Sequence, residues 1–114
     1  MRSFENRNDT WVFDEPFYGS FLKASGAPRP GHQAIIDSME CDSSSVIEIL
    51  TKDIKDSCSF NYQKHMTHHL LCTVSREWLS DLKNCFLIRD PVGVISSYKK
   101  IRANFNFEDL GMRQ

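Results

Sequence analysis

The stretch that decides the fold is Cys85-Phe86-Leu87-Ile88-Arg89-Asp90-Pro91, which residues 92–101 continue. Its first four residues are uncharged and mostly large and apolar, with polar residues on both sides, a pattern typical of a strand buried on both faces of a parallel sheet. Asp90 can cap a helix that begins at Pro91, because proline needs no amide partner in the first turn. Apolar residues then recur at helical spacing at Val94, Ile95, Tyr98 and Ile101. The sequence therefore predicts a strand, a tight turn and a helix, the unit from which α/β folds are built.

This unit would place Arg89 at the carboxyl end of a buried strand and Ser97 on the flank of the following helix. Ligands of open α/β sheets bind just outside the carboxyl ends of the strands, near helix amino termini that favour anions. A guanidinium with a hydroxyl nearby is suited to hold a phosphate there. Alternatively, Arg89 pairs with a surface carboxylate such as Asp90, and Ser97 is merely a small residue. The spacing alone leaves both interpretations open.

Two more strands and several helices are predicted along the chain. Residues 11–13 form a short apolar run that favours a second parallel strand, and residues 59–64 alternate between apolar and polar as a third strand does. Gly26 and Pro28 end a helix whose apolar face begins at Phe17. Residues 27–45 are rich in proline, glycine and serine and indicate a loop with a short helix near 34–39. Ser45 and Glu48 form a capping box that predicts the start of another helix. Ser75 is predicted to cap a further short helix.

The composition limits the classes of protein to which the chain can belong. The chain has 114 residues, of which 40% are hydrophobic and 11% aromatic, enough for the core of one small domain. Its formal charge of -1 argues against a nucleic-acid or anionic-membrane partner. No apolar run reaches the roughly 18 to 20 residues of a spanning helix, and no signal peptide opens the chain, so we expect a cytoplasmic protein. The four cysteines form no Cys-x-x-Cys pair and are interpreted as structural thiols, with Cys85 packed in its strand.

Three segments together resemble sulfotransferases that use 3′-phosphoadenosine 5′-phosphosulfate (PAPS), in particular a bacterial-type subgroup. They are Arg89-Asp90-Pro91 with Ser97-Tyr98, Asp14-Glu15-Pro16-Phe17-Tyr18-Gly19, and the His-rich run at residues 65–69. The resemblance implies an α/β fold of the P-loop NTPase kind, a three-layer parallel sheet flanked by helices. It also implies that Arg89 and Ser97 bind the 3′-phosphate of the nucleotide, and that no metal is required.

The same resemblance implies that part of the family fold is missing. Residues 1–8 look like the tail of a helix already under way, and no Gly-x-x-x-x-Gly-Lys-Ser/Thr or Gly-x-Gly-x-x-Gly phosphate loop occurs in the chain. We therefore expect residues 1–114 to be a single, partial sulfotransferase-like domain that lacks the loop for the 5′-phosphosulfate.

Candidate catalytic residues follow the predicted strands. The resemblance carries a catalytic base to His68, with His69 close behind, and a lysine that steadies the leaving phosphate to Lys64. A neutral imidazole suits proton acceptance at neutral pH. Glu15 is a rival base at the mouth of the sheet, although capping of the following helix would also explain Asp14 and Glu15. The alternatives for the histidines are surface or hydrogen-bonded residues with no role, and zinc ligands.

The predicted function is transfer of a sulfuryl group from PAPS to a hydroxyl or amine of a small molecule, impaired in a chain without the phosphate loop. Two alternatives stay open. One is a nucleotide kinase-like P-loop enzyme, which would need a phosphate loop and magnesium. The other is a non-catalytic remnant with residual nucleotide binding.

Overall fold

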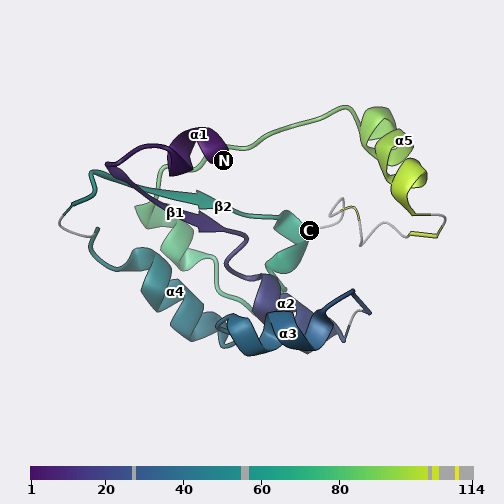
Figure 1. The fold of residues 1–114 in the computed structure, drawn as a ribbon, viewed down its shortest axis with the longest axis horizontal. Coiled ribbons are helices and arrows are strands. Elements are labelled where there is room, and N and C mark those ends of the chain that lie inside the picture. Colours follow the sequence, from purple (N-terminus) through teal and green to yellow (C-terminus); the bar gives the residue numbers. More distant parts are fainter. Residues whose placement is uncertain (27, 55–56, 103, 106–109, 111–114) are drawn as a thin grey trace. The chain divides into compact units, whose positions relative to one another are not determined.

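The computed structural model describes residues 1–26, 28–54, 57–102, 104–105 and 110. Its elements divide between two units, Met1–Val74 and Ser75–Gln114. The helices and strands, labelled in Figure 1, are α1 (Arg2–Glu5), β1 (Thr10–Asp14), α2 (Tyr18–Ser25), α3 (His32–Ser38), α4 (Ser43–Thr51), β2 (Phe60–Lys64), the 3-10 turns η1 (Thr67–His69) and η2 (Glu77–Asp81), and α5 (Pro91–Ile101).

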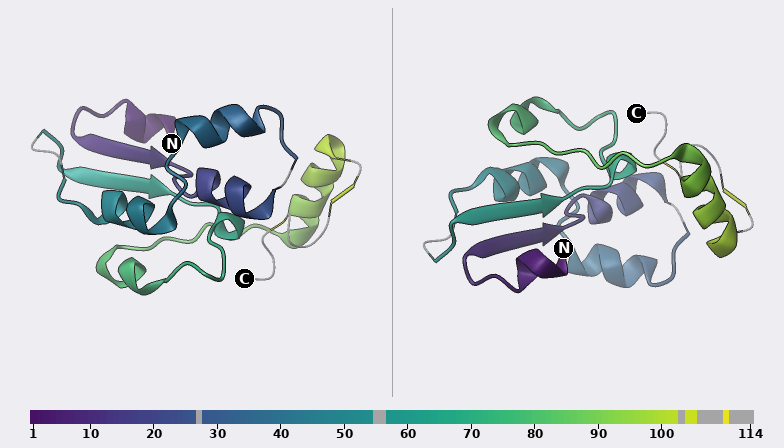
Figure 2. Two further views of the ribbon diagram at one scale, coloured as in Figure 1. Left: turned by 90° about the horizontal axis from the view of Figure 1, so that it is seen from below. Right: turned by 90° about the horizontal axis from the view of Figure 1, so that it is seen from above.

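A two-stranded parallel sheet organises the first unit. β1 pairs with β2 in a register that runs from Thr10 opposite Phe60 to Asp14 opposite Lys64. Figure 2 shows the two strands side by side and pointing the same way. Parallel neighbours need a crossover connection, and α2, α3 and α4 supply it. Because both strands end at the same edge, the side chains that follow β1 and β2 meet there.

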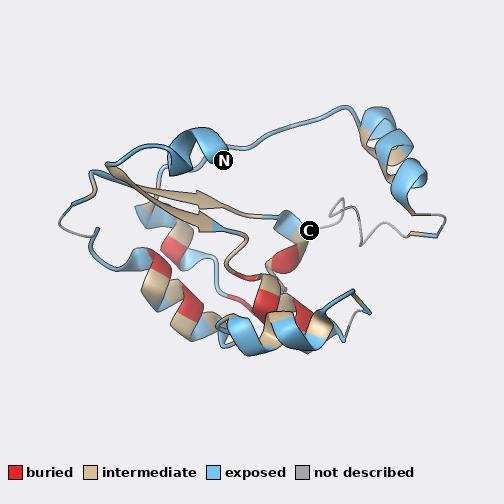
Figure 3. Cartoon of the chain, in the orientation of Figure 1, coloured by how far each residue is buried: buried red, intermediate tan, exposed pale blue. Residues whose placement is uncertain are grey.

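The core of the first unit lies where α2 and α4 turn their apolar sides inward, as the red segments of Figure 3 show. Its buried apolar side chains are Phe17, Leu22, Val46, Leu50 and Val74. Gly19 lets α2 approach the chain after α3 closely, because a Cβ at this position would lie 2.8 Å from the Cβ of Met39. α2 ends at Gly26 in the left-handed conformation that glycine adopts readily, as the sequence predicts.

The start of α4 differs from the prediction. The sequence favours Ser45 with Glu48 as a capping box, but the N-cap is Asp42, whose Oδ2 accepts a hydrogen bond of 2.8 Å from the Ser45 amide. The helix therefore begins at Ser43, two residues before the predicted cap. Aspartate and serine are both good capping residues. Here the carboxylate of Asp42, three residues before Ser45, accepts the hydrogen bond from the Ser45 amide.

The predicted strand at residues 85–88 is wrong. No strand forms there, and Phe86, Leu87 and Ile88 are 81%, 90% and 89% exposed. Cys85 is exposed too, so its predicted packing in a buried strand is also wrong. An apolar run becomes a buried strand only when neighbouring strands pair with it, and the sheet of the described residues consists of β1 and β2. The predicted α/β class is confirmed, but the described sheet has two strands rather than the three predicted.

The helix after that run is confirmed in the second unit. Asp90 caps α5: its Oδ1 accepts from the Val92 amide at 3.3 Å and its Oδ2 from the Gly93 amide at 3.1 Å, with Pro91 in the first turn. Earlier in this unit, the Ser75 hydroxyl accepts a hydrogen bond from the Glu77 amide at the start of η2. Trp78 is buried, and its indole N–H donates to the Ser75 carbonyl at 2.9 Å.

Candidate functional site

Charged side chains meet at the carboxyl edge of the sheet, where β1 and β2 end. The Lys64 ammonium donates to Glu15 Oε1 and lies 3.1 Å from Asp14 Oδ1. The hydrogen bond with Glu15 is the main cause that raises the pKa of Lys64 above its usual value. Lys64 therefore carries its charge throughout the neutral range, and its side chain is still 37% exposed. A fixed cation open to solvent can bind an anion or stabilise negative charge that develops during a reaction.

The backbone of Glu15 has an unusual conformation at this cluster of charges. Its φ of 51° puts it in the left-handed region, the only non-glycine residue to adopt it in the part of the chain that the structure describes. The Glu15 amide donates to the Lys64 carbonyl at 2.9 Å, which continues the parallel pairing one residue beyond β1. A non-glycine residue in this region is uncommon and often lies at a functional site.

Three histidines follow β2, as the sequence predicts, but their surroundings differ. His69 is only 4% exposed and lies among aromatic rings: its ring centroid is 4.9 Å from those of Tyr18 and Phe21 and 4.4 Å from that of His68. His68 is half-buried and meets Phe21 edge-on at 5.6 Å. The aromatic face of α2 therefore fixes the orientation of both rings.

Burial governs the charge state of His69. Loss of hydration is the main cause that lowers its pKa from 6.5 to about 4, and the neighbouring His68 is the next largest. Its Nδ1 is buried and has no hydrogen-bond partner. His69 is thus a neutral imidazole at pH 7 that is shielded from solvent, which suits it to support His68 better than to meet a substrate.

Sequence reasoning placed His65 in the His-rich run without giving it a role of its own, and it missed Gln63 as a member of the site. His65 is half-buried, its pKa is lowered by burial, and its Nε2 lies 3.1 Å from Gln63 Oε1. The Gln63 amide nitrogen in turn donates to the Leu50 carbonyl at 2.9 Å. The available signal was the polar pair Asn61 and Gln63, spaced two apart on one face of a strand.

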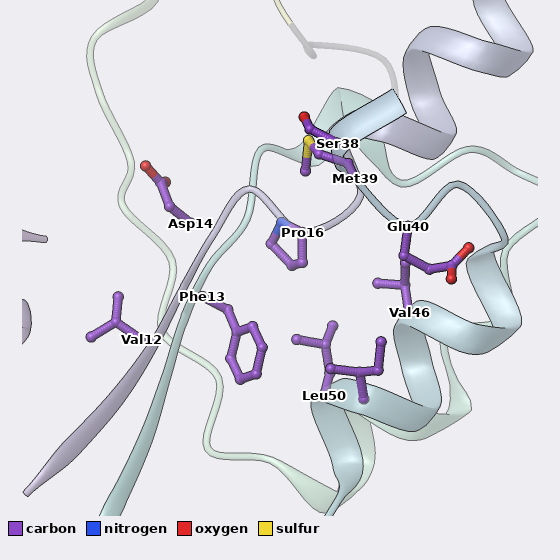
Figure 4. Close-up of a pocket in the computed structure, with 10 residues that line it drawn as sticks. Val12, Phe13, Asp14, Pro16, Ser38, Met39, Glu40, Val46 and Leu50 are labelled. Carbon is purple, nitrogen blue, oxygen red and sulfur yellow. The ribbon is translucent and has the colours of Figure 1, made fainter. Parts of the chain in front are cut away.

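An apolar cavity of about 310 Å³ opens beside the end of β1. Figure 4 shows Phe13, Val46 and Leu50 turned toward one another across it, with Pro16 at one end. The carboxylates of Asp14 and Glu40, which border the cavity, point away from its centre (Figure 4). Its volume lies at the low end of ligand pockets, about 300–1,000 Å³.

The predicted site residues fall in both units. The first unit brings Glu15 and Lys64 into contact and places His68 beside His69. Arg89 and Ser97 belong to the second unit, where both are exposed. Arg89 precedes the N-cap of α5 and does not end a strand, which corrects the geometry predicted for it. Ser97 lies on α5, as predicted.

The described residues contain neither a cluster suited to a metal ion nor a helix suited to span a membrane. No group of three or more His, Cys, Asp or Glu side chains among them could hold a metal ion. None of the described helices combines the length and the apolar character needed to cross a membrane.

A parallel α/β sheet with charged and imidazole side chains at its carboxyl edge is typical of a ligand-binding α/β domain. Comparison with known families is more specific, because a sulfotransferase domain model matches residues 1–113. The chain therefore belongs to the sulfotransferase domain family, as its motifs suggest.

Two curated plant proteins are similar to the chain. They are the branched-chain-amino-acid aminotransferase-like proteins 2 and 1 of Arabidopsis thaliana, which are 35% and 36% identical to it over 115 residues. Each match covers 98% of this chain but 20% of the relative, so the chain spans about a fifth of their length. No solved structure matches it significantly.

Proposed function

We propose that this chain serves in sulfuryl transfer from PAPS to a hydroxyl or amine of a small molecule in the cytoplasm, without nucleic acid, membrane or metal. The match of the sulfotransferase domain to residues 1–113 is the observation that carries the proposal. The proposal includes the fold that the family resemblance implies, a three-layer parallel sheet of the P-loop NTPase kind to which β1 and β2 would contribute two strands.

The reaction is an in-line displacement. A base removes the proton of the acceptor group, the acceptor oxygen or nitrogen forms a bond to sulfur, and the bond between sulfur and the phosphate oxygen breaks. Adenosine 3′,5′-bisphosphate leaves with the electron pair. As in phosphoryl transfer, positioning and charge stabilisation do most of the work.

The carboxyl edge of β1 and β2 supplies groups for these steps. Lys64, held as a cation by Glu15 and Asp14, would stabilise charge on the departing phosphate oxygen. His68 would take the proton, and the buried neutral His69 would hold the ring of His68 in place. Glu15 is the rival base, because its carboxylate lies at the same edge and its side chain is 29% exposed. The cavity beside Phe13 would receive the apolar part of the acceptor.

Arg89 and Ser97 would bind the 3′-phosphate of the donor. Arg89 lies next to the capped amino terminus of α5, where the helix dipole favours an anion. Ser97 lies on α5 itself, and side chains on a helix lean toward its amino terminus. Both side chains are exposed and so open to a ligand.

Calorimetry on the chain tests the donor site. We expect adenosine 3′,5′-bisphosphate to bind more tightly than adenosine 5′-monophosphate, because the two ligands differ in the 3′-phosphate alone. Arg89→Ala should remove this preference, costing about tenfold or more for loss of a charge-assisted contact. Arg2→Ala, which removes an exposed arginine on α1, should leave it unchanged. Equal affinity for both nucleotides in the unaltered chain would overturn the assignment.

Neither alternative function gains a specific observation. A nucleotide kinase-like enzyme predicts a magnesium-dependent phosphoryl transfer from ATP, whereas the family model that matches is that of a sulfotransferase domain. A non-catalytic remnant predicts nucleotide binding without transfer, so measuring labelled sulfate transfer from PAPS beside the calorimetry separates it from the proposal.

A further inference from the structure

Residues 85–88 of the second unit form an apolar segment that is open to solvent. Phe86, Leu87 and Ile88 are 81%, 90% and 89% exposed, and no helix or strand includes them. Within the described part of the chain, the backbone of residues 85–88 makes no hydrogen bond. Large apolar side chains gathered at one place on a surface usually mark a contact with another molecule. An unpaired backbone beside them can also accept an added strand.

The segment is complementary to a second copy of itself. In a dimer with two-fold symmetry, two antiparallel strands pair about one residue that faces its own counterpart. With Leu87 at this point, Phe86 of each copy lies opposite Ile88 of the other. Aromatic and β-branched side chains form favourable pairs across strands. Asn84 of each copy lies opposite Asp90 of the other, so both ends of the pairing avoid a contact between like charges.

The two neighbouring registers are less favourable. Pairing about Phe86 would place Lys83 opposite Arg89 at both ends, and like charges directly opposite each other are destabilising. Pairing about Ile88 would place the aromatic ring of Phe86 opposite the Asp90 carboxylate. The charges on either side of the apolar run therefore select Leu87 as the centre of the pairing.

From this self-complementarity we propose that residues 85–88 pair as an antiparallel strand with the same segment of a second copy, with Leu87 on the two-fold axis. The helix that follows need not change, because α5 begins at Pro91, after the paired residues. The proposal identifies an interaction surface and its partner, and it does not depend on the proposed sulfuryl transfer.

The contact is small, so the association is weak. Residues 85–88 are far fewer than the roughly 20–30 residues a side of a stable interface. We expect a dissociation constant on the order of 0.1–1 mM. At low micromolar concentration the chain is then a single copy, and its segment is exposed as the structure shows.

Sedimentation equilibrium between about 10 μM and about 1 mM tests for the second copy. The average mass of the unaltered chain should rise toward that of two copies. Leu87→Lys should hold it at one copy, because two cations would face each other on the axis. Ile101→Lys, a matched change of an 80% exposed residue on α5, should leave the rise as it was.

Three results would overturn the proposal. One copy at every concentration would mean that the segment stays exposed, is covered within its own chain or binds a different protein. A rise that Leu87→Lys leaves intact would place the contact elsewhere. A rise that both variants reduce equally would indicate apolar association without a defined surface.

Cysteine cross-linking tests the register, in a chain whose exposed cysteines, Cys72 and Cys85, are changed to serine. In the proposed pairing the two Cα atoms of position 87 lie about 4.5–5.5 Å apart, which a disulfide can span. Those of position 88 lie roughly 8 Å apart, which is too far. With oxidised glutathione, Leu87→Cys should therefore form a linked dimer about tenfold faster than Ile88→Cys, although the two positions are equally exposed. Equal rates, or a faster reaction at position 88, would overturn the register.

Discussion

Replacing two leucines with alanine compares the buried core with the exposed segment at residues 85–88. Leu22 on α2 is 0% exposed and Leu87 is 90% exposed. Truncating a fully buried leucine costs about 2–5 kcal/mol, through lost burial and the cavity left behind. Leu22→Ala should therefore remove a large part of the roughly 5–15 kcal/mol that stabilises a small domain. Leu87→Ala should change the free energy of unfolding by less than about 0.5 kcal/mol, as exposed sites usually do.

Urea unfolding followed by far-ultraviolet circular dichroism measures both effects on the same chain. The Leu22→Ala midpoint should drop sharply, and the Leu87→Ala midpoint should overlay that of the unaltered chain. The same chemical change is made at both positions, so their difference reports burial. If residues 85–88 formed the buried strand that their sequence favours, Leu87→Ala would cost as much as Leu22→Ala. That result would refute the structure of this segment.

Two further predictions concern pH and capping. His69 has a pKa of about 4 in the folded chain, below its ordinary 6.5. As the pH drops, His69 is therefore protonated in the unfolded chain before it is protonated in the folded one. The free energy of unfolding should fall by on the order of 3 kcal/mol between pH 6.5 and pH 4. His69→Phe should flatten this dependence in urea midpoints measured at pH 7 and pH 5, and an unchanged slope would contradict it. Asp42→Ala should lower the midpoint of thermal unfolding more than Ser45→Ala does, because Asp42 caps α4. The reverse order would support the predicted capping box of Ser45 with Glu48.

Local patterns predicted much of the first unit. The apolar run at residues 11–13 and the alternation at residues 59–64 became the paired strands β1 and β2, and Gly26 ended α2. These signals are local: side-chain periodicity, β-branched and aromatic residues, and the backbone freedom of glycine. Asp90 and Pro91 predicted the start of α5 for the same reason.

Residues 85–88 show where such patterns stop being sufficient. Whether an apolar run is buried depends on strands elsewhere in the chain that pair with it. The residues of the run itself do not indicate whether such strands form. The candidate site shows the same division. Position after a strand indicated Glu15, Lys64 and the histidines, but the contact of Gln63 with both Leu50 and His65 depends on how α4 crosses β2. Nothing in the spacing of Leu50 and Gln63 predicts that crossing.

The left-handed backbone of Glu15 also affects how charge is shared at the end of β1. In a continuing strand, consecutive side chains point to opposite faces, so one amine could not serve both Asp14 and Glu15. The turn at φ 51° breaks that alternation, and Lys64 reaches both carboxylates. Inserting or deleting a single residue at this corner would separate the pair even if every side chain were retained. The backbone conformation of Glu15 thus allows Lys64 to act as the counterion of both Asp14 and Glu15.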